Sequence, residues 1–452
     1  MAEANRGHGI SLNSASNSNS LKNNTISSNT IYGIYLSSSG NNQVSDNNRI
    51  INNGGCGISL SNSNSNRIFN NYISNAENTY FEGTNTGNSW NTNKTEQVNI
   101  VGGPYAGGNF WAKPDGTGLS QINRDFSGDG FLDAENDLTG INATAAARNV
   151  DYLPLARTAI VDPSGTKGYA RIQDAVNAAD NGYSIAVYPG TYRENLDLSK
   201  GMAITAISGS PDNTIITASD PKTHVFNVHS SGTVISGFSI VGAAGTDSST
   251  GIYLDSVSDC VLSNNRVSNN SIGICRSYSG KNTLLNNKIS SNKYDFKDSG
   301  TLENAIDTSN TVGGKPIYYL CGKSDVEIGF SSNAGTVYCI NCNNITIKNL
   351  ALKNNPRGVS LYNTGNSRIL NNSIQNNFDG IYLESSSANT LDSNTVNKNV
   401  NNGISLAGAA SNAVINNRIT ESGVSGIGLS SSGSNQIYNN YCNYSAWVKQ
   451  HQ

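Results

Sequence analysis

The chain has 452 residues, of which only 13% are charged, whereas 46 are glycine. The formal net charge is -3 and no basic stripe occurs, so the composition gives no reason to expect a nucleic-acid partner. No apolar run approaches the length of a membrane span, and so few aliphatic residues can build only a thin core, as in an elongated repeat array.

The first stretch of the chain repeats one short motif at a fixed spacing. Gly9, Gly33 and Gly57 each open a G-I-x-L tetrapeptide, 24 residues apart, and a polar corner and an N-N-x-I element recur between them. This alternation predicts strands of three or four residues whose Ile and Leu face inward, and the period is typical of a parallel β-solenoid coil of about 22–24 residues. The start, MAEANRGHGISL, has no signal-peptide core and opens almost inside a repeat, which favours a piece of a longer chain.

Glycine and asparagine recur where such a coil must turn. Glycine accepts positive φ, so we expect the repeated glycines at corners, and asparagine is the next best residue for a left-handed turn. Stacking coils about 4.8 Å apart would place like residues in columns and let each asparagine amide bond to those above and below.

Residues 79–157 interrupt the repeat. They contain Trp90, Trp111, glycine clusters and the acidic run DFSGDGFLDAEND. Oxygen donors alternate around a glycine turn in this run, which suits Ca²⁺, and the candidate ligands are Asp125, Ser127, Asp129, Phe131 and Asp133. The run departs from the EF-hand pattern, with Ser127 at position three and Asn136 at position twelve, so an acidic, solvated turn is an equal alternative.

A short helix and a second array follow. Ile172, Ala175, Val176 and Ala179 recur at helical spacing, and a strand is expected at 184–188. A helix in this place is typical of a cap over the open edge of a β-helix. The tetrapeptide glycines then recur at 251 and 273, and again at 358, 380, 403 and 426. We predict three parts: the last coils of a first module (1–78), a linking segment (79–157) and a second β-helix module with a short capping helix (158–452).

Several stretches resemble known families. RIQDAVNAADNGYSIAVYPGTYREN resembles the opening of pectate-lyase-like β-helix proteins, while NIVGGPYAGGNFW, the SGDG run and DYLPL together resemble the closing segment of NosD-type repeats of archaeal cell-surface proteins. The resemblance implies an all-β, right-handed parallel β-helix, exported and displayed in tandem copies, sometimes acting on or holding polysaccharide. NosD itself assists copper-site maturation, but two Met and four His give no visible copper cluster.

One cation and two carboxylates stand out in the second array. The residues before the tetrapeptide glycines would form a surface column in which Arg357 and Asp379 are neighbours, and Glu384 lies at the other end of the strand of Asp379. Polysaccharide-cleaving enzymes need paired carboxylates, or a base and a cation, on one face. Arg357, Asp379 and Glu384 are therefore the candidate catalytic residues, and the alternative is a common, weak surface ion pair.

Three tyrosines occupy the outward position of G-I-x-L and could stack on sugar rings, although tyrosine also favours strands. They are Tyr35, Tyr253 and Tyr382. Arg276 stands where the inward leucine usually lies, so either its coil deviates or the arginine meets an acid.

Two further motifs carry less information. Cys339 and Cys342 form a CxxC that we interpret as small buried hydrophobes rather than as half of a redox or metal site. Seven N-x-S/T sequons, among them Asn93, Asn142 and Asn344, offer acceptors for glycosylation if the protein is exported.

Two functions follow from these observations. Regular coils and low charge favour an extracellular, cell-surface structural or adhesive module whose partners are cell-surface polysaccharide or neighbouring copies of itself. The alternative is a polysaccharide lyase or glycoside hydrolase acting on a cell-wall or matrix polysaccharide, although the sequence lacks the motifs of polygalacturonases and pectate lyases. Ca²⁺ is the one cofactor that the sequence suggests.

Overall fold

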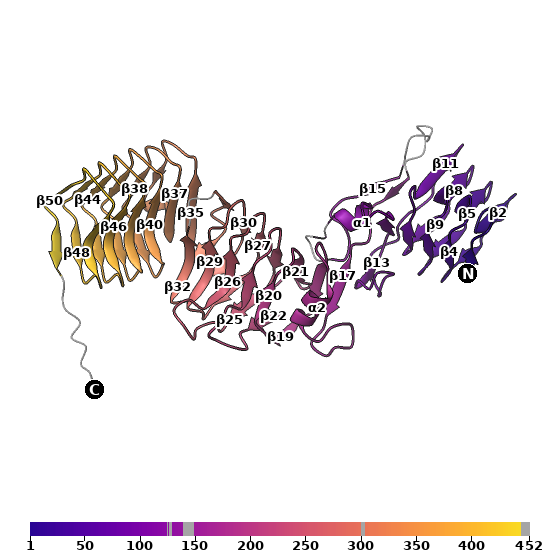
Figure 1. Ribbon diagram of the computed structural model, residues 1–452, viewed down its shortest axis with the longest axis horizontal. Helices are drawn as coiled ribbons and strands as arrows, with labels where there is room; N and C mark the ends of the chain where they lie inside the picture. Colours follow the sequence, from indigo (N-terminus) through magenta and orange to yellow (C-terminus); the bar gives the residue numbers. More distant parts are fainter. Residues whose placement is uncertain (124, 126–128, 139–148, 300–302, 444–452) are drawn as a thin grey trace. The chain divides into compact units, whose positions relative to one another are not determined.

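Both parts of the chain are stacks of parallel β-coils. A computed structural model describes all residues except 124, 126–128, 139–148, 300–302 and 444–452. The chain forms two units, residues 1–189 with 200–207 and residues 190–199 with 208–452 (Figure 1). Each is a right-handed parallel β-helix, as the sequence predicts. The predicted boundaries at 78 and 157 stay predictions.

Three parallel sheets run along the coils of the first unit, and each coil contributes strands to them in turn. The first sheet contains β1 (Ala2–Glu3), β4 (Thr25–Ser27), β7 (Arg49–Ile51), β10 (Tyr72–Ser74) and β14 (Phe110–Ala112). The second contains β2 (Ile10–Asn13), β5 (Tyr32–Ser37), β8 (Cys56–Ser61) and β11 (Thr79–Glu82). The third contains β3 (Ser20–Leu21), β6 (Gln43–Ser45) and β9 (Arg67–Phe69).

The end of the first array is followed by smaller elements. Two antiparallel pairs join β12 (Thr95–Glu96) to β13 (Tyr105–Ala106) and β15 (Asn136–Asp137) to β16 (Val150–Asp151). Helix α1 (Leu119–Ile122) packs on β14. Strands β17 (Thr158–Val161), β18 (Ser184–Val187) and β21 (Ala203–Ala206) pair in parallel.

The predicted amphipathic helix is confirmed as α2 (Ile172–Ala178). It buries Ile172, Ala175 and Val176 and packs against β17 and β18. No helix in the described part of the chain has the length and apolar character that crossing a membrane requires.

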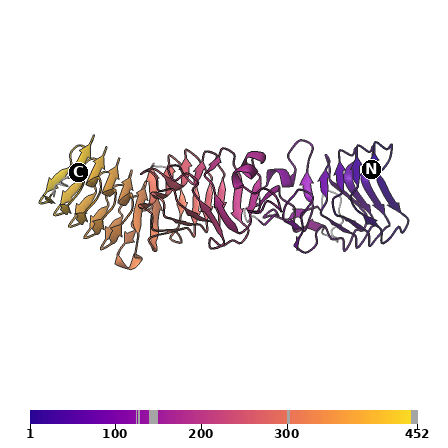
Figure 2. The same ribbon diagram turned by 90° about the horizontal axis from the view of Figure 1, so that it is seen from below.

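Five sheets run along the second unit, and Figure 2 shows the short strands of its successive coils lying side by side. The longest contains β19 (Gly190–Arg193), β22 (Thr214–Thr217), β25 (Ser239–Val241), β28 (Arg266–Ser268), β31 (Lys288–Ile289), β34 (Thr311–Val312), β35 (Lys315–Cys321), β37 (Thr336–Ile340), β40 (Arg357–Tyr362), β43 (Asp379–Glu384), β46 (Asn402–Ala407) and β49 (Ser425–Ser430). All its described pairings are parallel except that of β34 with β35.

The other four sheets of this unit are shorter. Two lie in its first part: β20 (Leu196–Leu198), β23 (Phe226–Val228), β26 (Thr250–Asp255), β29 (Ile272–Ser277) and β32 (Tyr294–Ser299); and β24 (Val234–Ser236), β27 (Val261–Ser263), β30 (Thr283–Leu285) and β33 (Ala305–Ile306). Two begin later: β36 (Glu327–Ile328), β38 (Thr346–Lys348), β41 (Arg368–Leu370), β44 (Thr390–Asp392), β47 (Ala413–Ile415) and β50 (Gln436–Tyr438); and β39 (Ala351–Lys353), β42 (Ser373–Gln375), β45 (Thr395–Asn397), β48 (Arg418–Thr420) and β51 (Tyr441–Asn443).

Like residues stack on like residues along each sheet. Ile34 of β5 pairs with Ile10 and Ile58, and Ile381 of β43 pairs with Ile404. Ile34, Ile58, Ile381 and Ile404 are fully buried. The predicted aliphatic columns and the inward direction of the G-I-x-L isoleucines are therefore confirmed.

The repeated glycines are required by close packing and not by a left-handed backbone. Gly33, Gly380 and Gly403 all lack positive φ. A Cβ on Gly380 would lie 2.4 Å from the carbonyl oxygen of Gly403 and 2.5 Å from Cγ1 of Val396. The expectation that these glycines turn the corners is wrong, because the neighbouring coil passes too close for any side chain.

Asparagine and serine hold the left-handed corners instead. Asn264, Asn371 and Asn416 have φ of 55°, 54° and 53°. The expectation for asparagine is confirmed, and its short amide tolerates this conformation better than most side chains do.

A second set of asparagines turns inward and forms hydrogen-bonded ladders. Asn394 is fully buried, and its Nδ2 donates to Oδ1 of Asn417 (2.9 Å) and to the carbonyl oxygen of Ile369 (2.8 Å). Its Oδ1 accepts from Nδ2 of Asn372 at 3.0 Å. Such a chain of satisfied amides fixes the register of each coil on the next.

The ladder of the first unit ends at a buried carboxylate, Asp151. The backbone N–H of Asn109 donates to its Oδ2 at 2.7 Å, Nε1 of Trp111 donates to the same oxygen at 2.8 Å, and the N–H of Leu153 donates to Oδ1 at 3.1 Å. A carboxylate only accepts, so it can end a chain of donors. Burial raises the pKa of Asp151 to about 7. Asn109 and Trp111 belong to GGNFW and Asp151 to DYLPL, so this contact joins the two stretches in space.

Gly380→Ala should destabilise the second unit, because the new methyl group overlaps the carbonyl of Gly403. Overpacking of this kind costs about 1–3 kcal/mol, and urea unfolding followed by circular dichroism measures it. The control is Gly433→Ala, since a Cβ there has no atom of the described residues within 4 Å. Equal destabilisation by the two substitutions would contradict the packing explanation.

The raised pKa of Asp151 predicts that the first unit loses stability as the pH rises. The carboxyl ionises near ~3.9 when unfolded and at about 7 when folded. Its contribution is therefore complete below the unfolded value and is lost as the pH rises through about 7. Asp151→Asn should lack this part of the pH dependence. Tryptophan fluorescence reports it once Trp447 is replaced by Phe in both chains, because Trp90 and Trp111 are buried in this unit. An identical pH dependence in both chains would refute the assignment.

Candidate functional site

An interruption of the winding in the second unit creates a pocket. Strand β32 is the last described strand of its sheet, and the backbone carbonyl oxygens of Phe296 and Asp298 accept from the hydroxyls of Tyr338 (3.2 Å) and Tyr362 (3.3 Å). These hydroxyls satisfy carbonyl groups that another strand would otherwise bond. The sheet therefore stops at β32 without leaving these two polar groups unpaired.

An asparagine ladder also stops here. Nδ2 of Asn270 donates to Oδ1 of Asn292 at 3.1 Å, and Nδ2 of Asn292 donates to Oδ1 of Asp295 at 3.0 Å. Burial raises the pKa of Asp295 to about 6. As in the first unit, an acceptor-only carboxylate ends the chain of amides.

The pocket beside β32 has a volume of about 300 Å³. Its apolar wall includes Ile272, Tyr294 and Phe378, and the last two rings meet edge to face with centroids 6.1 Å apart. Its charged lining consists of Asp247, Lys293, Lys297, Asp298, Arg357 and Asp379. Aromatic walls with a few placed charges are typical of small-molecule sites.

Arg357 and Asp379 lie in this pocket and are neighbours, as the sequence predicts. They are directly opposite each other on β40 and β43, with Nε of Arg357 3.9 Å from Oδ2 of Asp379. The side chains are only 21% and 6% exposed, so they form a wall of the pocket rather than an open surface pair. Oδ1 of Asp379 is held by Nδ2 of Asn401 (2.8 Å) and the N–H of Asn402 (3.1 Å).

Tyrosine rings hold the guanidinium of Arg357 in place. Its Cζ lies 3.4 Å from the centroid of the Tyr382 ring, and Nη1 donates to the hydroxyl of Tyr362. Burial acts against the charge, but the tyrosines and Asp379 outweigh it and raise the pKa of Arg357. The arginine is therefore a fixed, permanent cation in the pocket wall.

Glu384 is not brought to the pocket. It lies five residues along β43 from Asp379, so the two Cα atoms are about 16 Å apart at ~3.3 Å per residue. Its Oε2 accepts from the hydroxyl of Tyr382 at 2.9 Å. Paired carboxylates of glycosidases are about 5–9.5 Å apart, so the geometry does not support an acid–base pair of Asp379 and Glu384.

Asp298 is the acidic residue that sequence reasoning missed. It lies directly opposite Arg276 on the next coil, and Nη2 of Arg276 is 2.5 Å from its Oδ2. Arg276 also donates to the carbonyl of Ser279 (2.8 Å) and to the hydroxyl of Tyr319 (3.0 Å). The arginine thus meets an acid. The coil spacing of 22 residues from Arg276 was the signal that could have found Asp298.

Lys297 is the cation of the pocket without a partner among the described residues. Asp247 pairs with Lys293 at 2.8 Å, Asp379 faces Arg357, and Asp298 pairs with Arg276. Lys297 is half-buried, and although its backbone pairs with β29, its side chain makes no ion pair or hydrogen bond with any described residue. An anionic group of a ligand could therefore complete the charge balance.

The three tyrosines predicted to contact sugars each have one ring face covered. Tyr35 stacks on His8 with centroids 4.6 Å apart, Tyr253 stacks on His224 at 4.5 Å, and Tyr382 carries the guanidinium of Arg357. Burial lowers the pKa of His8 and that of His224, as expected for imidazoles packed against rings. Sugar contact at the three tyrosines stays a prediction.

The predicted calcium loop is only partly described, since Ser127 lies outside the described residues. Oδ2 of Asp125 accepts from the N–H of Gly130 (2.6 Å) and its Oδ1 from that of Asp129 (3.1 Å), while Oδ2 of Asp129 pairs with Lys94 (3.0 Å). Calcium would have to share or replace these bonds, and its binding stays a prediction for these residues with Phe131 and Asp133.

No group of three or more His, Cys, Asp or Glu side chains in the described part of the chain is arranged to hold a metal ion. Cys339 and Cys342 are buried, as expected of small apolar residues.

The chain belongs to a family of parallel β-helix proteins. Residues 1–116, 188–315 and 321–450 match the family described as "Periplasmic copper-binding protein (NosD)". A cell surface glycoprotein of Methanothermus fervidus is 29% identical over 106 residues, which are 23% of this chain and 16% of that protein. The chain thus aligns with about a sixth of that relative.

Similar solved structures share the β-helix fold at low identity. Pectate lyase Pel9A has a TM-score of 0.27 and 14% identity, covering 63% of this chain and 78% of that one. The Dettilon tailspike protein has a TM-score of 0.34 and 14% identity, covering 63% and 60%. The periplasmic alginate epimerase AlgG has a TM-score of 0.24 and 11% identity, covering 89% and 78%.

Arg276→Met should destabilise the second unit by about 3–5 kcal/mol, because it leaves Asp298 charged and buried without its partner. The double variant Arg276→Met with Asp298→Leu should recover most of this loss, since it removes both charges. Urea unfolding of the parent and the two variants gives the free energies. If the double variant were as unstable as the single one, the pair would not be the cause.

Proposed function

We propose that this chain is an exported structural or adhesive module of the cell surface that holds an acidic polysaccharide in the pocket beside β32. The observation that carries the proposal is Lys297, a half-buried cation with no partner among the described residues, in a pocket where each carboxylate already has a cation. A uronate carboxylate would supply the missing charge.

The rest of the pocket suits a sugar ring. Phe378 is 42% exposed and borders the pocket together with Tyr294. Aromatic faces pack against the apolar C–H face of a sugar, while the amide and carboxylate groups around Asp379 can bond hydroxyls. The guanidinium of Arg357, which the tyrosines hold in place, offers paired N–H donors that can bond both oxygens of a carboxylate.

The comparisons support the location. The matched family is described as periplasmic, and the Methanothermus fervidus relative is a cell surface protein. Both descriptions refer to proteins outside the cytoplasm. Self-association with neighbouring copies stays a second prediction for the same module.

Calorimetric titration with oligogalacturonate tests the proposal. Lys297→Ala should weaken binding at least ~10-fold, because a hydrogen bond to a charged group contributes about 1.5–3 kcal/mol. Lys348→Ala is the matched control, since Lys348 is also half-buried but pairs with Glu327 outside the pocket (2.8 Å). A neutral glucan of equal length should bind more weakly. Equal affinity for both oligomers, or equal loss in both variants, would refute the acidic ligand.

A lyase or glycoside hydrolase is the second candidate, because a cation and a carboxylate share the pocket. The same oligomer tests it: a lyase releases unsaturated uronate, which absorbs in the ultraviolet, and a hydrolase releases reducing ends. Turnover abolished by Asp379→Asn would assign catalysis to the pocket. Binding without turnover supports the adhesive module.

A further inference from the structure

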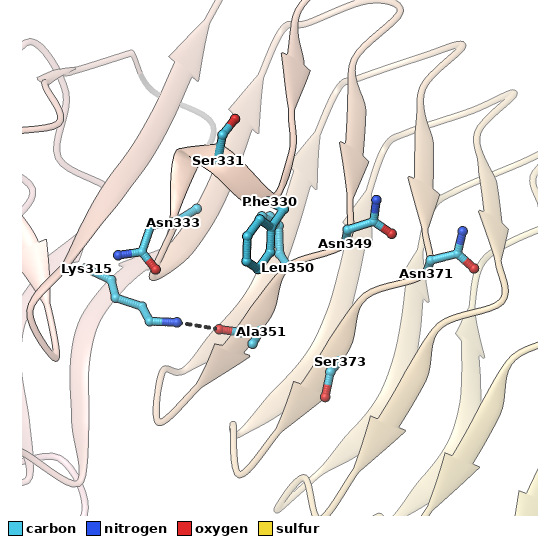
Figure 3. A pocket seen from close by; sticks show the side chains of 10 residues that line it. Lys315, Phe330, Ser331, Asn333, Asn349, Leu350, Ala351, Asn371 and Ser373 are labelled. Carbon is cyan, nitrogen blue, oxygen red and sulfur yellow. Dashed lines mark hydrogen bonds between the residues drawn. The ribbon is translucent and has the colours of Figure 1, made fainter.

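A second interruption leaves an open groove at the start of another sheet. Strand β39 is the first strand of its sheet, and in the preceding coil the chain forms a short 3-10 turn, η1 (Phe330–Ser332), instead of a strand. Nζ of Lys315 donates to the carbonyl oxygen of Ala351 at 3.3 Å, as Figure 3 shows. The groove beside this edge has a volume of about 610 Å³.

Phe330 is the unusual residue of the groove. Its side chain is 82% exposed, the highest exposure among the large aromatic residues in the described part of the chain. Figure 3 shows its ring beside Leu350, with Asn349 and Asn371 following on successive coils. An exposed ring next to a hollow is a ready platform for the apolar face of a sugar.

The chemistry of the groove is neutral. Among the described residues, no carboxylate lines it, and the one lining cation, Lys315, already bonds the backbone of β39. The other polar groups are the amides of Asn333, Asn349 and Asn371 and hydroxyls of two serines. Amides and hydroxyls both donate and accept, which suits the hydroxyls of a neutral sugar.

The groove also contains both functional residues of a glycosylation sequon. Asn371, Asn372 and Ser373 form N-x-S, and Asn371 and Ser373 line the groove. Asn371 is exposed at a left-handed corner with φ of 54°, whereas Asn372 is buried in the ladder. In the folded coil, only the outward amide of the pair has room for an attached glycan.

We propose that Asn371 carries an N-linked glycan whose first sugars lie in this groove against Phe330. Nδ2 of Asn371 forms a bond to C1 of the first sugar of a polyprenyl-phosphate-linked oligosaccharide. The bond from C1 to the phosphate oxygen breaks, the phosphate leaves with its electron pair, and Nδ2 loses one proton. The proposal uses the export included in the proposed function but not the acidic-sugar pocket.

The fold restricts when the glycan can be added. The N–H of Asn371 donates to the carbonyl of Asp392 (3.1 Å), and that of Ser373 donates to the carbonyl of Leu350 (2.8 Å). Once these coils have wound, the sequon is fixed in the ladder and cannot bend into an enzyme. Modification therefore precedes winding, and the sugars settle on Phe330 as the coils form.

Secretion from a eukaryotic host and glycopeptide mass spectrometry test the modification. Asn371 should be occupied, and Ser373→Ala should remove the glycan while keeping the left-handed asparagine. The exposed sequon asparagines Asn269 and Asn344, which do not line the groove, are internal controls. An unmodified Asn371 on chains modified at Asn269 or Asn344 would overturn the proposal. Because the host enforces export, that outcome leaves the polysaccharide pocket unaffected.

Thermal unfolding tests whether the first sugars of the glycan pack against Phe330. The glycosylated chain should melt about 2–4 °C above Ser373→Ala, the shift that about 1 kcal/mol gives in a unit of this size. In a Phe330→Ser background this difference should vanish, whereas it should persist in Tyr278→Ser, a matched exposed aromatic outside the groove. A difference that survives Phe330→Ser would place the glycan elsewhere and overturn the second half of the proposal.

Discussion

Vertical register between coils is the constraint on which the rest of this structure depends. Aliphatic columns alone hold it weakly, because Ile, Val and Leu replace one another in a column, as where Val359 lies opposite Ile381. The buried amides are stricter. A slip of one residue would move Asn394 out of reach of Asn372 and Asn417 and leave several buried groups unpaired, each costing about 1–3 kcal/mol. The asparagines therefore specify which coil geometry is native, while the aliphatic residues supply the driving force for burial.

The candidate sites lie where this regularity stops. A regular coil satisfies its own backbone through its neighbours and leaves little for a ligand to bond. At β32 a sheet and a ladder end together, and the pocket with Arg357, Asp379 and Lys297 lies beside that end. At β39 a sheet begins, and the groove with Phe330 lies beside that beginning. The candidate binding surfaces of the second unit are thus a consequence of interruptions in the repeat.

Much of the fold could be predicted because each coil repeats the same local pattern. The period predicted the neighbours of Ile34 and the contact of Arg357 with Asp379, since both depend only on the register between adjacent coils. The prediction that the repeated glycines turn the corners was wrong. They are needed because the Gly403 carbonyl lies close to Gly380, and this distance between coils cannot be read from the sequence of a single repeat.

The sites were harder to predict than the coils. Lys297 and Phe378 line one pocket only because the regular winding is interrupted between them in the sequence. The coil period before or after the interruption does not predict which residues become neighbours across it. Asp298 could have been predicted by the same coil spacing that identified Asp379 as a neighbour of Arg357, because Asp298 lies one coil after Arg276. The pocket could not be predicted because its residues become neighbours through the irregular segment between two regular stacks of coils.

The tyrosine hydroxyls over the edge of β32 have a consequence for how such a chain tolerates change. An uncovered strand edge invites pairing with another molecule and hence aggregation. Tyr338 and Tyr362 occupy two of its carbonyls from within the same unit. The second unit can therefore end one sheet and begin others within its length without exposing these two carbonyl groups, so stacks of coils with different sets of sheets can follow one another in one unit.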